Sequence, residues 1–189
     1  MNDIKTEVHN AFEVIKNGGI ILYPTDTVWG IGCDATNSEA VQKVFALKKR
    51  AESKSMIALV NGDRMLYHIF NEIPENAFQI WELSEKPTTL ILDNPRNIAK
   101  EIIAEDNSVG IRIVKESFCY NLMERMKKPL VSTSANISGD ATPKSSSEIH
   151  PEIIKGVDYV VNLYQDKKMD KPSTIIKLTL DNRVTIIRK

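Results

Sequence analysis

The sequence predicts an α/β domain with a mixed β-sheet, and three observations support this class. Short runs of apolar, β-branched residues typical of buried strands recur along the 189 residues. Segments with apolar residues at helical spacing lie between many of these runs. Strands and helices do not alternate strictly, and the last third is rich in strands, which favours a mixed sheet with antiparallel pairing there. The length fits one domain that spans residues 1–189.

The first predicted element is a helix over residues 3–17, where apolar or small residues recur at helical spacing. Gly18 and Gly19 end it, because glycine allows a left-handed C-terminal turn. Residues 20–23 follow as a short apolar strand that Pro24 ends. A polar loop comes next, and its two glycines suit a backbone that bends tightly or approaches a ligand closely.

Ser38 is the predicted N-cap of a helix over residues 38–47, because its hydroxyl can accept from a free amide of the first turn. Residues 56–60 form the next predicted strand. Residues 63–70 and 74–83 then have helical patterns, and the second of these begins with a proline.

The second half predicts more strands than helices. Strand patterns cover residues 88–92, 109–114, 130–133, 157–161, 173–178 and 184–187. Helical patterns cover residues 117–126 and 145–155. The last two strands form a predicted hairpin around Asp181 and Asn182.

Composition and simple motifs exclude several classes of protein. Lys+Arg and Asp+Glu both number 25, whereas a protein whose whole surface binds nucleic acid is usually basic. Cys33 and Cys119 lie far apart without metal-ligand or redox spacing, which favours a reducing compartment. No signal segment or membrane-length apolar run occurs. We therefore expect a cytoplasmic protein without a membrane partner.

The common phosphate-binding and hydrolytic motifs do not occur in this sequence. No G-x-x-x-x-G-K-[ST] or G-x-G-x-x-G loop follows a predicted strand, and no G-x-S-x-G is found. His9, His68 and His150 do not combine with the cysteines at metal-binding spacing. We expect structural or surface roles for these histidines and no protein-bound metal.

Residues 47–55 form a basic stretch in a chain without net charge. It holds Lys48, Lys49, Arg50 and Lys54 between a predicted helix and a predicted strand. Such a cationic loop can collect the oxygens of a polyphosphate. The same charges can instead be solvated at the end of the helix, where they complement its dipole. Composition alone leaves both interpretations open.

Hydroxyl-rich segments at the ends of predicted strands favour a functional role for the basic stretch. They are residues 25–27, 88–89, 132–136 and 172–174. Each alone could cap a helix or turn. Together they predict a site for a small polar substrate, because ligands of open α/β sheets bind where loops leave the strands. Arg112, flanked by isoleucines, either faces solvent or points into a cleft, where its guanidinium suits a carboxylate.

These segments resemble the YrdC-type threonylcarbamoyl-AMP synthases, in that family's order and spacing over essentially the whole chain. The K-x-R and S-x-N pair is present as Lys48 with Arg50 and Ser134 with Asn136. The resemblance implies a YrdC-like twisted open mixed sheet with flanking helices and a concave, positively charged cavity. The segments are PTDTVWGIGCDA (24–35), LKKR (47–50) with Lys54 beyond it, SVGIR (108–112), STSANISG (132–139), PSTII (172–176) and IIR (186–188).

The resemblance also implies an activity. L-Threonine, bicarbonate and ATP, with Mg²⁺ on the phosphates, would give L-threonylcarbamoyl-AMP and pyrophosphate. The product would pass to downstream threonylcarbamoyl transferase proteins, which modify the adenosine beside the anticodon of tRNA. Catalysis would be positioning and charge stabilisation, because the carbamate nucleophile arrives already anionic.

Site residues follow from the same resemblance, position by position. The residues implied for catalysis are Lys48 and Arg50. Those implied for ATP are Lys48, Arg50, Lys54, Ser108, Ser134, Asn136, Thr142 and Arg188. Those implied for threonine are Thr27, Arg112, Ser132 and Ser173.

The chain departs from the family pattern at several positions. Lys49 and Ala51 stand where the family usually has glycine and proline, and Ser55 replaces a frequent proline. Residues 84–86 replace a W-P-G run, and Leu59 stands where some members place a histidine near threonine. The chain stops one residue beyond the IIR segment, as in the short form of the family.

Two other functions remain open at the level of sequence. One is an RNA-binding module that holds tRNA or double-stranded RNA against the basic stretch, although an aromatic-basic stacking pattern is missing from the sequence. The other is a paralogue that binds nucleotide and regulates without synthase activity.

Overall fold

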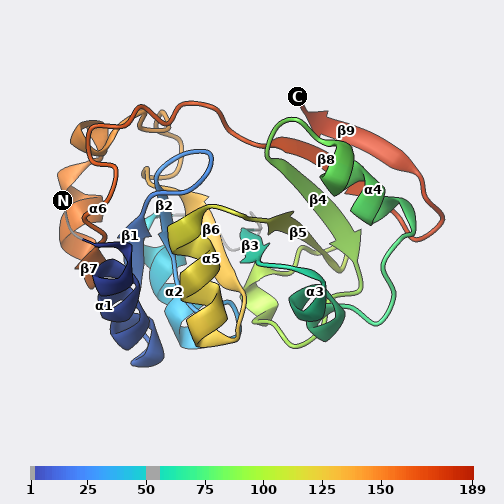
Figure 1. The fold of residues 1–189 in the computed structure, drawn as a ribbon, viewed down its shortest axis with the longest axis horizontal. Helices are drawn as coiled ribbons and strands as arrows, with labels where there is room; N and C mark the ends of the chain where they lie inside the picture. The colour runs from blue at the N-terminus through green and yellow to red at the C-terminus, as the bar shows by residue number, and fades with distance from the viewer. Residues whose placement is uncertain (1–2, 50–55) are drawn as a thin grey trace.

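The computed structural model describes residues 3–49 and 56–189. Within these ranges the chain forms an open nine-stranded mixed sheet with flanking helices (Figure 1). Helices α1 (Ile4–Lys16) and α5 (Ser117–Met126) lie in front of the sheet in this view, and α2 (Ser38–Leu47) lies behind it. The mixed α/β class predicted from the sequence is confirmed.

The remaining elements follow the predicted order closely. The strands are β1 (Ile21–Tyr23), β2 (Gly30–Gly32), β3 (Ile57–Val60), β4 (Thr88–Asp93), β5 (Ser108–Ile113), β6 (Leu130–Ser134), β7 (Tyr159–Val160), β8 (Thr174–Leu178) and β9 (Val184–Arg188). The other helices are α3 (Asp63–Ile69), α4 (Asn76–Leu83) and α6 (Pro151–Gly156), with short 3₁₀ turns η1 (Lys100–Ile102) and η2 (Ser146–Glu148).

Strand pairing shows why the sheet is mixed. The order across it is β7-β1-β2-β6-β3-β5-β4-β8-β9 among the described strands. The pairs β1–β7, β3–β5 and β4–β8 are parallel, and the other neighbours are antiparallel. The predicted β8–β9 hairpin is confirmed, and Asn182 takes a positive φ of 60° in its turn. Elsewhere in the last third the pairing is divided: β6 is antiparallel to β2 and β3, whereas β7 and β8 are parallel to β1 and β4.

Strand β2 corrects the prediction of a loop after Pro24. Its second glycine is tightly packed, because a methyl group on Gly32 would lie against the carbonyl oxygen of Val131 and 2.7 Å from the Tyr23 ring. The Tyr23 hydroxyl donates to that same carbonyl at 3.0 Å. Glycine therefore serves close packing of β1, β2 and β6 here, rather than a bend.

The helix boundaries differ in three places from those predicted from the sequence. Asn37, not Ser38, is the N-cap of α2, and its Oδ1 accepts from the Ala40 amide at 3.1 Å. Helix α4 begins two residues after Pro74, whose carbonyl accepts from the Ala77 amide at 2.9 Å. The helix predicted over residues 145–155 is divided into η2 and α6, because the intervening residues are extended.

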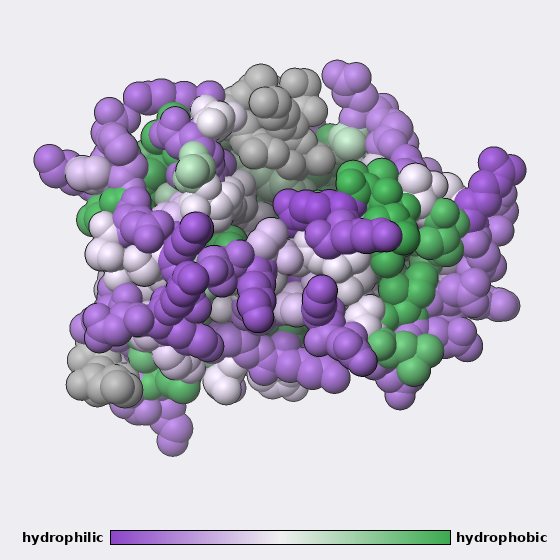
Figure 2. Space-filling view, turned by 90° about the horizontal axis from the view of Figure 1, so that it is seen from above, coloured by the Kyte–Doolittle hydropathy of each residue, from purple (hydrophilic) through white to green (hydrophobic). Residues whose placement is uncertain are grey.

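A connection between β7 and β8 passes across the upper edge of the sheet in Figure 1 and joins its two halves. The loop between β1 and β2 projects toward the same edge. At the far end, edge strand β9 leaves Val184, Ile186 and Ile187 each more than half exposed. Figure 2, seen from above, shows apolar surface at that end of the molecule. No helix in the described ranges is long and apolar enough to cross a membrane.

Candidate functional site

A cavity of about 240 Å³ opens on the sheet at the upper edge described above. The loop between β1 and β2, strands β3, β5, β6, β8 and β9, and the β7–β8 connection contribute to its lining. The predicted site residues that it brings together are Thr27, Arg112, Ser132, Ser134, Thr142, Ser173 and Arg188. These residues are distant in sequence, so the fold brings residues predicted for threonine and residues predicted for ATP together in one cavity.

Strand register explains why these side chains meet. Ile57 on β3 pairs with Gly110 on β5 and with Ser132 on β6. Side chains alternate along a strand, so Ser108, Gly110 and Arg112 share one face of β5. Ser132 lies on that same face of the sheet, one strand beyond β3. A row of polar groups results, and Ile57 packs over Gly110 between the two polar residues of β5, where an added methyl group would lie 2.9 Å from Ile57 Cγ2.

Arg112 is buried in this row, with 3% of its side chain exposed. Its Nη2 lies 3.0 Å from Oδ1 of Asp26, but the contact lacks hydrogen-bond geometry, and Nε and Nη2 have no hydrogen-bond partner. A buried guanidinium edge without an acceptor is costly unless a ligand completes it. Of the two interpretations left by the sequence, Arg112 points into a cleft and does not face solvent.

Arg188 provides the second guanidinium of the cavity. Its Nε and Nη2 donate to the Ser173 carbonyl at 3.0 and 2.9 Å, which fixes the end of β9 against the start of β8. The Ser173 hydroxyl lies 2.9 Å from the hydroxyl of Thr89. Burial, and then the neighbouring charge of Arg112, lower the pKa of Arg188 from its usual value. The two guanidinium groups are therefore close enough to repel, and an anion between them would be stabilised.

The loop before β2 presents a threonine to the cavity through a local turn. Oγ1 of Thr25 accepts from the amides of Thr27 and Val28 at 3.0 and 3.2 Å. The two threonine hydroxyls are 2.9 Å apart. This turn is held by its own hydrogen bonds, so Thr27 lines the cavity from a fixed backbone.

The S-x-N segment is held by the buried ammonium of Lys48, which is 1% exposed. Its Nζ donates to the carbonyls of Ser134 and Asn136, the latter at 2.7 Å. The Lys48 carbonyl in turn accepts from the Ser138 amide at 2.8 Å. Asn136 keeps one buried side-chain oxygen, Oδ1, without a hydrogen-bond partner. The K-x-R and S-x-N segments are thus directly joined, although a contact of Lys48 with phosphate remains a prediction.

Other predicted residues are placed less directly. Arg50 and Lys54 lie outside the described residues. Ser108 does not line the cavity, and its hydroxyl donates to Asp106 at 2.5 Å. Lys49 stands at the position where the resembling family usually has glycine, and it has a positive φ of 50°. A glycine adopts this conformation easily, which explains the family preference.

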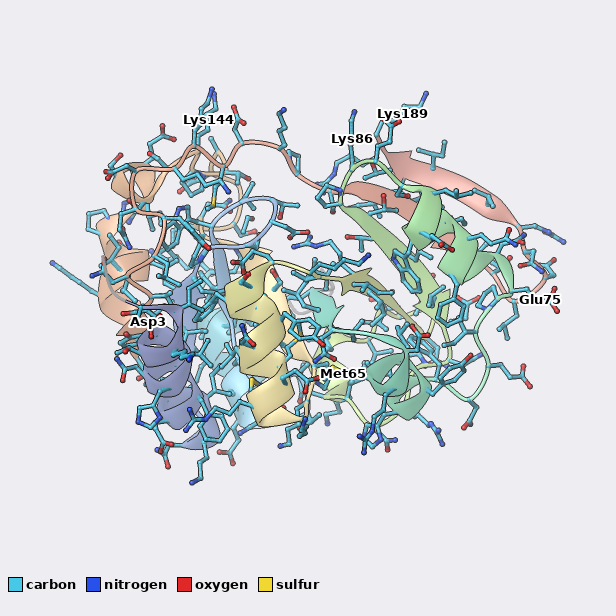
Figure 3. All side chains as sticks on the ribbon, viewed as in Figure 1. Asp3, Met65, Glu75, Lys86, Lys144 and Lys189 are labelled. Carbon is cyan, nitrogen blue, oxygen red and sulfur yellow. The ribbon has the colours of Figure 1, made fainter. Side chains whose placement is uncertain are left out.

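Exposed lysines also lie along the upper edge of the molecule. Figure 3 draws Lys86, Lys144 and Lys189 along the upper edge of the molecule, where the β7–β8 connection crosses. All three are exposed.

The described side chains offer neither an evident nucleophile nor a metal site. Burial raises the pKa of both thiols, Cys33 and Cys119, well above the usual value, so they stay protonated. No group of three or more His, Cys, Asp or Glu within residues 3–49 and 56–189 is arranged to hold a metal ion. The arrangement can bind anions and orient a polar substrate, which suits a reaction driven by positioning.

The sequence missed two polar residues of this site. Asp26, between two threonines, received no role, although it forms the ion pair with Arg112. Thr89 was noted only as part of a hydroxyl-rich segment, and it contacts Ser173. Its position between two threonines of the PTDT segment could have indicated this role, because a carboxylate close to a buried site needs a cationic partner.

A protein-family model described as "Telomere recombination", for the Sua5, YciO and YrdC proteins, matches residues 13–189. A curated relative from Methanocaldococcus jannaschii is named "Putative threonylcarbamoyl-AMP synthase". It is 37% identical over 180 residues, which cover 91% of this chain and 80% of that protein.

Solved structures share the fold. Sua5 of P. abyssi, complexed with L-threonine, has a TM-score of 0.83 and 24% identity over 94% of this chain. This chain spans 52% of that longer protein. YciO of E. coli has a TM-score of 0.82 and 21% identity, covering 100% of this chain and 91% of its own. At these identities the likeness shows the fold alone.

Proposed function

The chain belongs to the Sua5/YciO/YrdC family and is an enzyme of the nucleotidyl transferase type, and we propose that it is an L-threonylcarbamoyladenylate synthase. Its substrates would be L-threonine, bicarbonate and ATP, and its products L-threonylcarbamoyl-AMP and pyrophosphate. The observation that carries the proposal is the cavity in which Arg112, with its unpartnered guanidinium edge, meets Arg188 and the hydroxyls of three separate loops.

Threonine fits the Arg112 side of the cavity. Its carboxylate can accept from Nε and Nη2, which have no hydrogen-bond acceptor within the protein. Thr27, Ser132 and Ser173 bring hydroxyls to the same space, where they can bond the threonine hydroxyl and amine. Support also comes from the L-threonine complex of the P. abyssi protein, which shares this fold.

ATP would lie toward the S-x-N segment and β9. Ser134, Thr142 and Arg188 line this part of the cavity, and Asn136 has a free oxygen beside it. Lys48 fixes the segment, and Arg50 and Lys54 would reach the phosphates. Mg²⁺ would be held by the phosphate oxygens themselves and would neutralise their charge. Ser108 shares the face of Arg112 and could contact a nucleotide extended along β5.

The chemistry follows from this placement. The threonine amine combines with bicarbonate to give a carbamate, with loss of water. A carbamate oxygen then attacks the α-phosphorus of ATP, and the bond to pyrophosphate breaks. The described residues hold the two anions in line and stabilise the charge on the transferring group. The product would pass to transferase proteins that modify the adenosine beside the anticodon of tRNA.

Release of pyrophosphate from ATP tests this proposal. We expect release only when L-threonine and bicarbonate are both present, because the carbamate is the nucleophile. L-Serine, which lacks the methyl group, and D-allo-threonine, which is inverted only at the α-carbon, serve as matched controls. Equal release with these amino acids, or release without bicarbonate, would contradict the proposed reaction.

A further inference from the structure

Asp26 lies beside Arg112, the residue to which the proposed threonine carboxylate binds. Its Oδ1 lies 3.0 Å from Nη2 of Arg112, which is 3% exposed. A buried guanidinium without a counter-ion costs several kcal/mol. In the described part of the chain, Asp26 is the acid that forms an ion pair with this arginine. A carboxylate of the protein itself therefore neutralises Arg112.

This ion pair is incomplete, which distinguishes it from a permanent structural bridge. One carboxylate oxygen approaches one nitrogen, and the hydrogen-bond geometry is not met. A ligand carboxylate that approaches Nε and Nη2 together would form two parallel charge-assisted hydrogen bonds, which are stronger. Arg112 therefore keeps binding capacity that Asp26 does not use.

Asp26 and a ligand carboxylate would compete for the same nitrogen, Nη2, and the two carboxylates would repel each other there, so Asp26 turns away when the ligand binds. The structure provides space for that movement. The Asp26 side chain is 22% exposed, and it lines a second cavity of about 830 Å³ that Arg112 does not line. Lys86 and Lys115 line that cavity and offer cationic partners.

The backbone need not move for this exchange. Thr25 Oγ1 accepts from the amides of Thr27 and Val28, so the turn that carries Asp26 is fixed on both sides. Rotation of one exposed carboxylate about its side-chain bonds is enough. Thr27 then keeps its place in the cavity while Asp26 leaves.

We propose that Asp26 is an exchangeable internal carboxylate, which neutralises and orients Arg112 in the empty enzyme and is displaced by the carboxylate of L-threonine. This inference rests on the proposed function. Asp26 is a positioning residue that acts through Arg112. Its second effect is selectivity, because small anions must compete with it for the guanidinium.

Asp26→Asn tests the proposal, since it removes the charge and keeps the shape. We expect the Kd for L-threonine, measured by calorimetry, to fall at least threefold. Acetate, which the wild-type enzyme should bind poorly, should become a measurable ligand. Thermal unfolding should occur at a lower temperature without ligand, and added L-threonine should raise it more than in the wild type.

Two further variants provide the controls. Asp34→Asn removes a more deeply buried carboxylate, which is 9% exposed and pairs with Lys128 at 2.6 Å outside the cavity, and it should leave the threonine Kd unchanged. Asp26→Glu keeps the charge, so its threonine Kd should not fall below the wild-type value. Its threonine Kd can also be measured if the asparagine variant does not fold.

A threonine Kd that is unchanged or raised in Asp26→Asn would overturn the proposal. The first result would make the ion pair structural, and the second would make Asp26 a direct ligand of the substrate. Failure of the wild-type enzyme to bind L-threonine would instead contradict the proposed function. In that case acetate binding gained by Asp26→Asn would still support exchange at Arg112.

Discussion

Arg112 and Lys48 are both buried cations, and their surroundings give them different tasks. Lys48 donates to two backbone carbonyls, so its charge is used in holding the S-x-N segment. Arg112 has two nitrogens without an acceptor and faces the cavity. The first arrangement predicts a role in stability, and the second predicts a role in binding.

Arg112→Lys should raise the Kd for L-threonine at least tenfold. Lysine keeps the charge but loses the planar pair of donors that matches a carboxylate, and one charge-assisted hydrogen bond contributes about 1.5–3 kcal/mol. Calorimetric titration with L-threonine checks this, and ATP affinity should change little. Arg183→Lys, on a side chain that is 83% exposed, is the control. Equal threonine affinity in the Arg112 variant would contradict the assignment.

Lys48→Met should lower the free energy of unfolding by about 2 kcal/mol, because two carbonyls lose a shared charged donor. Lys49→Met provides a neighbouring control. That side chain is 63% exposed and pairs with Glu152 at 2.8 Å, and exposed pairs contribute about 0–1 kcal/mol. Urea denaturation measures both variants. Similar losses in the two would show that Lys48 does not fix the segment.

The basic stretch shows what sequence can predict about single residues. Its charge pattern indicated a cationic loop, yet Lys48 is buried and Lys49 is exposed. Spacing in the sequence could not separate them, because burial of Lys48 depends on carbonyls that lie 86 and 88 residues further along the chain. Asp26 was missed for the same reason, since its partner Arg112 belongs to a distant strand.

Among the elements, most helices and strands could be predicted because their apolar periodicity is strong. Strand β2 could not, since G-I-G offers one apolar side chain and two residues that weaken strands. Its position depends on β1 and β6, which pair with it on both sides. The divided helix over residues 145–155 likewise reflects extended residues at 149 and 150 that periodicity did not indicate.

Gly32→Ala should destabilise the protein by about 2–4 kcal/mol, because the added methyl group overlaps backbone that cannot move without disturbing the β2–β6 pair. Gly30→Ala is the matched control on the same strand. There the nearest atoms, Ser132 Oγ and the Thr133 carbonyl oxygen, are 3.4 Å away, so the loss should stay under about 1 kcal/mol. Denaturant midpoints compare the two. Equal midpoints would show that β2 is not closely packed.

For the whole molecule, the cavity depends on how strands from both halves of the chain are ordered. β6 lies between β2 and β3, and β8 lies beside β4, so segments around residues 27, 112, 134 and 173 meet on one face. Local pattern predicted the strands but not this order. The family resemblance supplied the residue set, and the structure explains how that set comes together.

The central claim concerns one product, and mass spectrometry of the reaction mixture tests it most directly. Purified protein with L-threonine, ¹³C-bicarbonate and ATP should give L-threonylcarbamoyl-AMP that is one mass unit heavier than with ordinary bicarbonate. Arg112→Lys should give much less of this product at limiting threonine. Absence of the labelled adenylate from an enzyme that binds both ATP and L-threonine would contradict the account and favour a regulatory nucleotide-binding role.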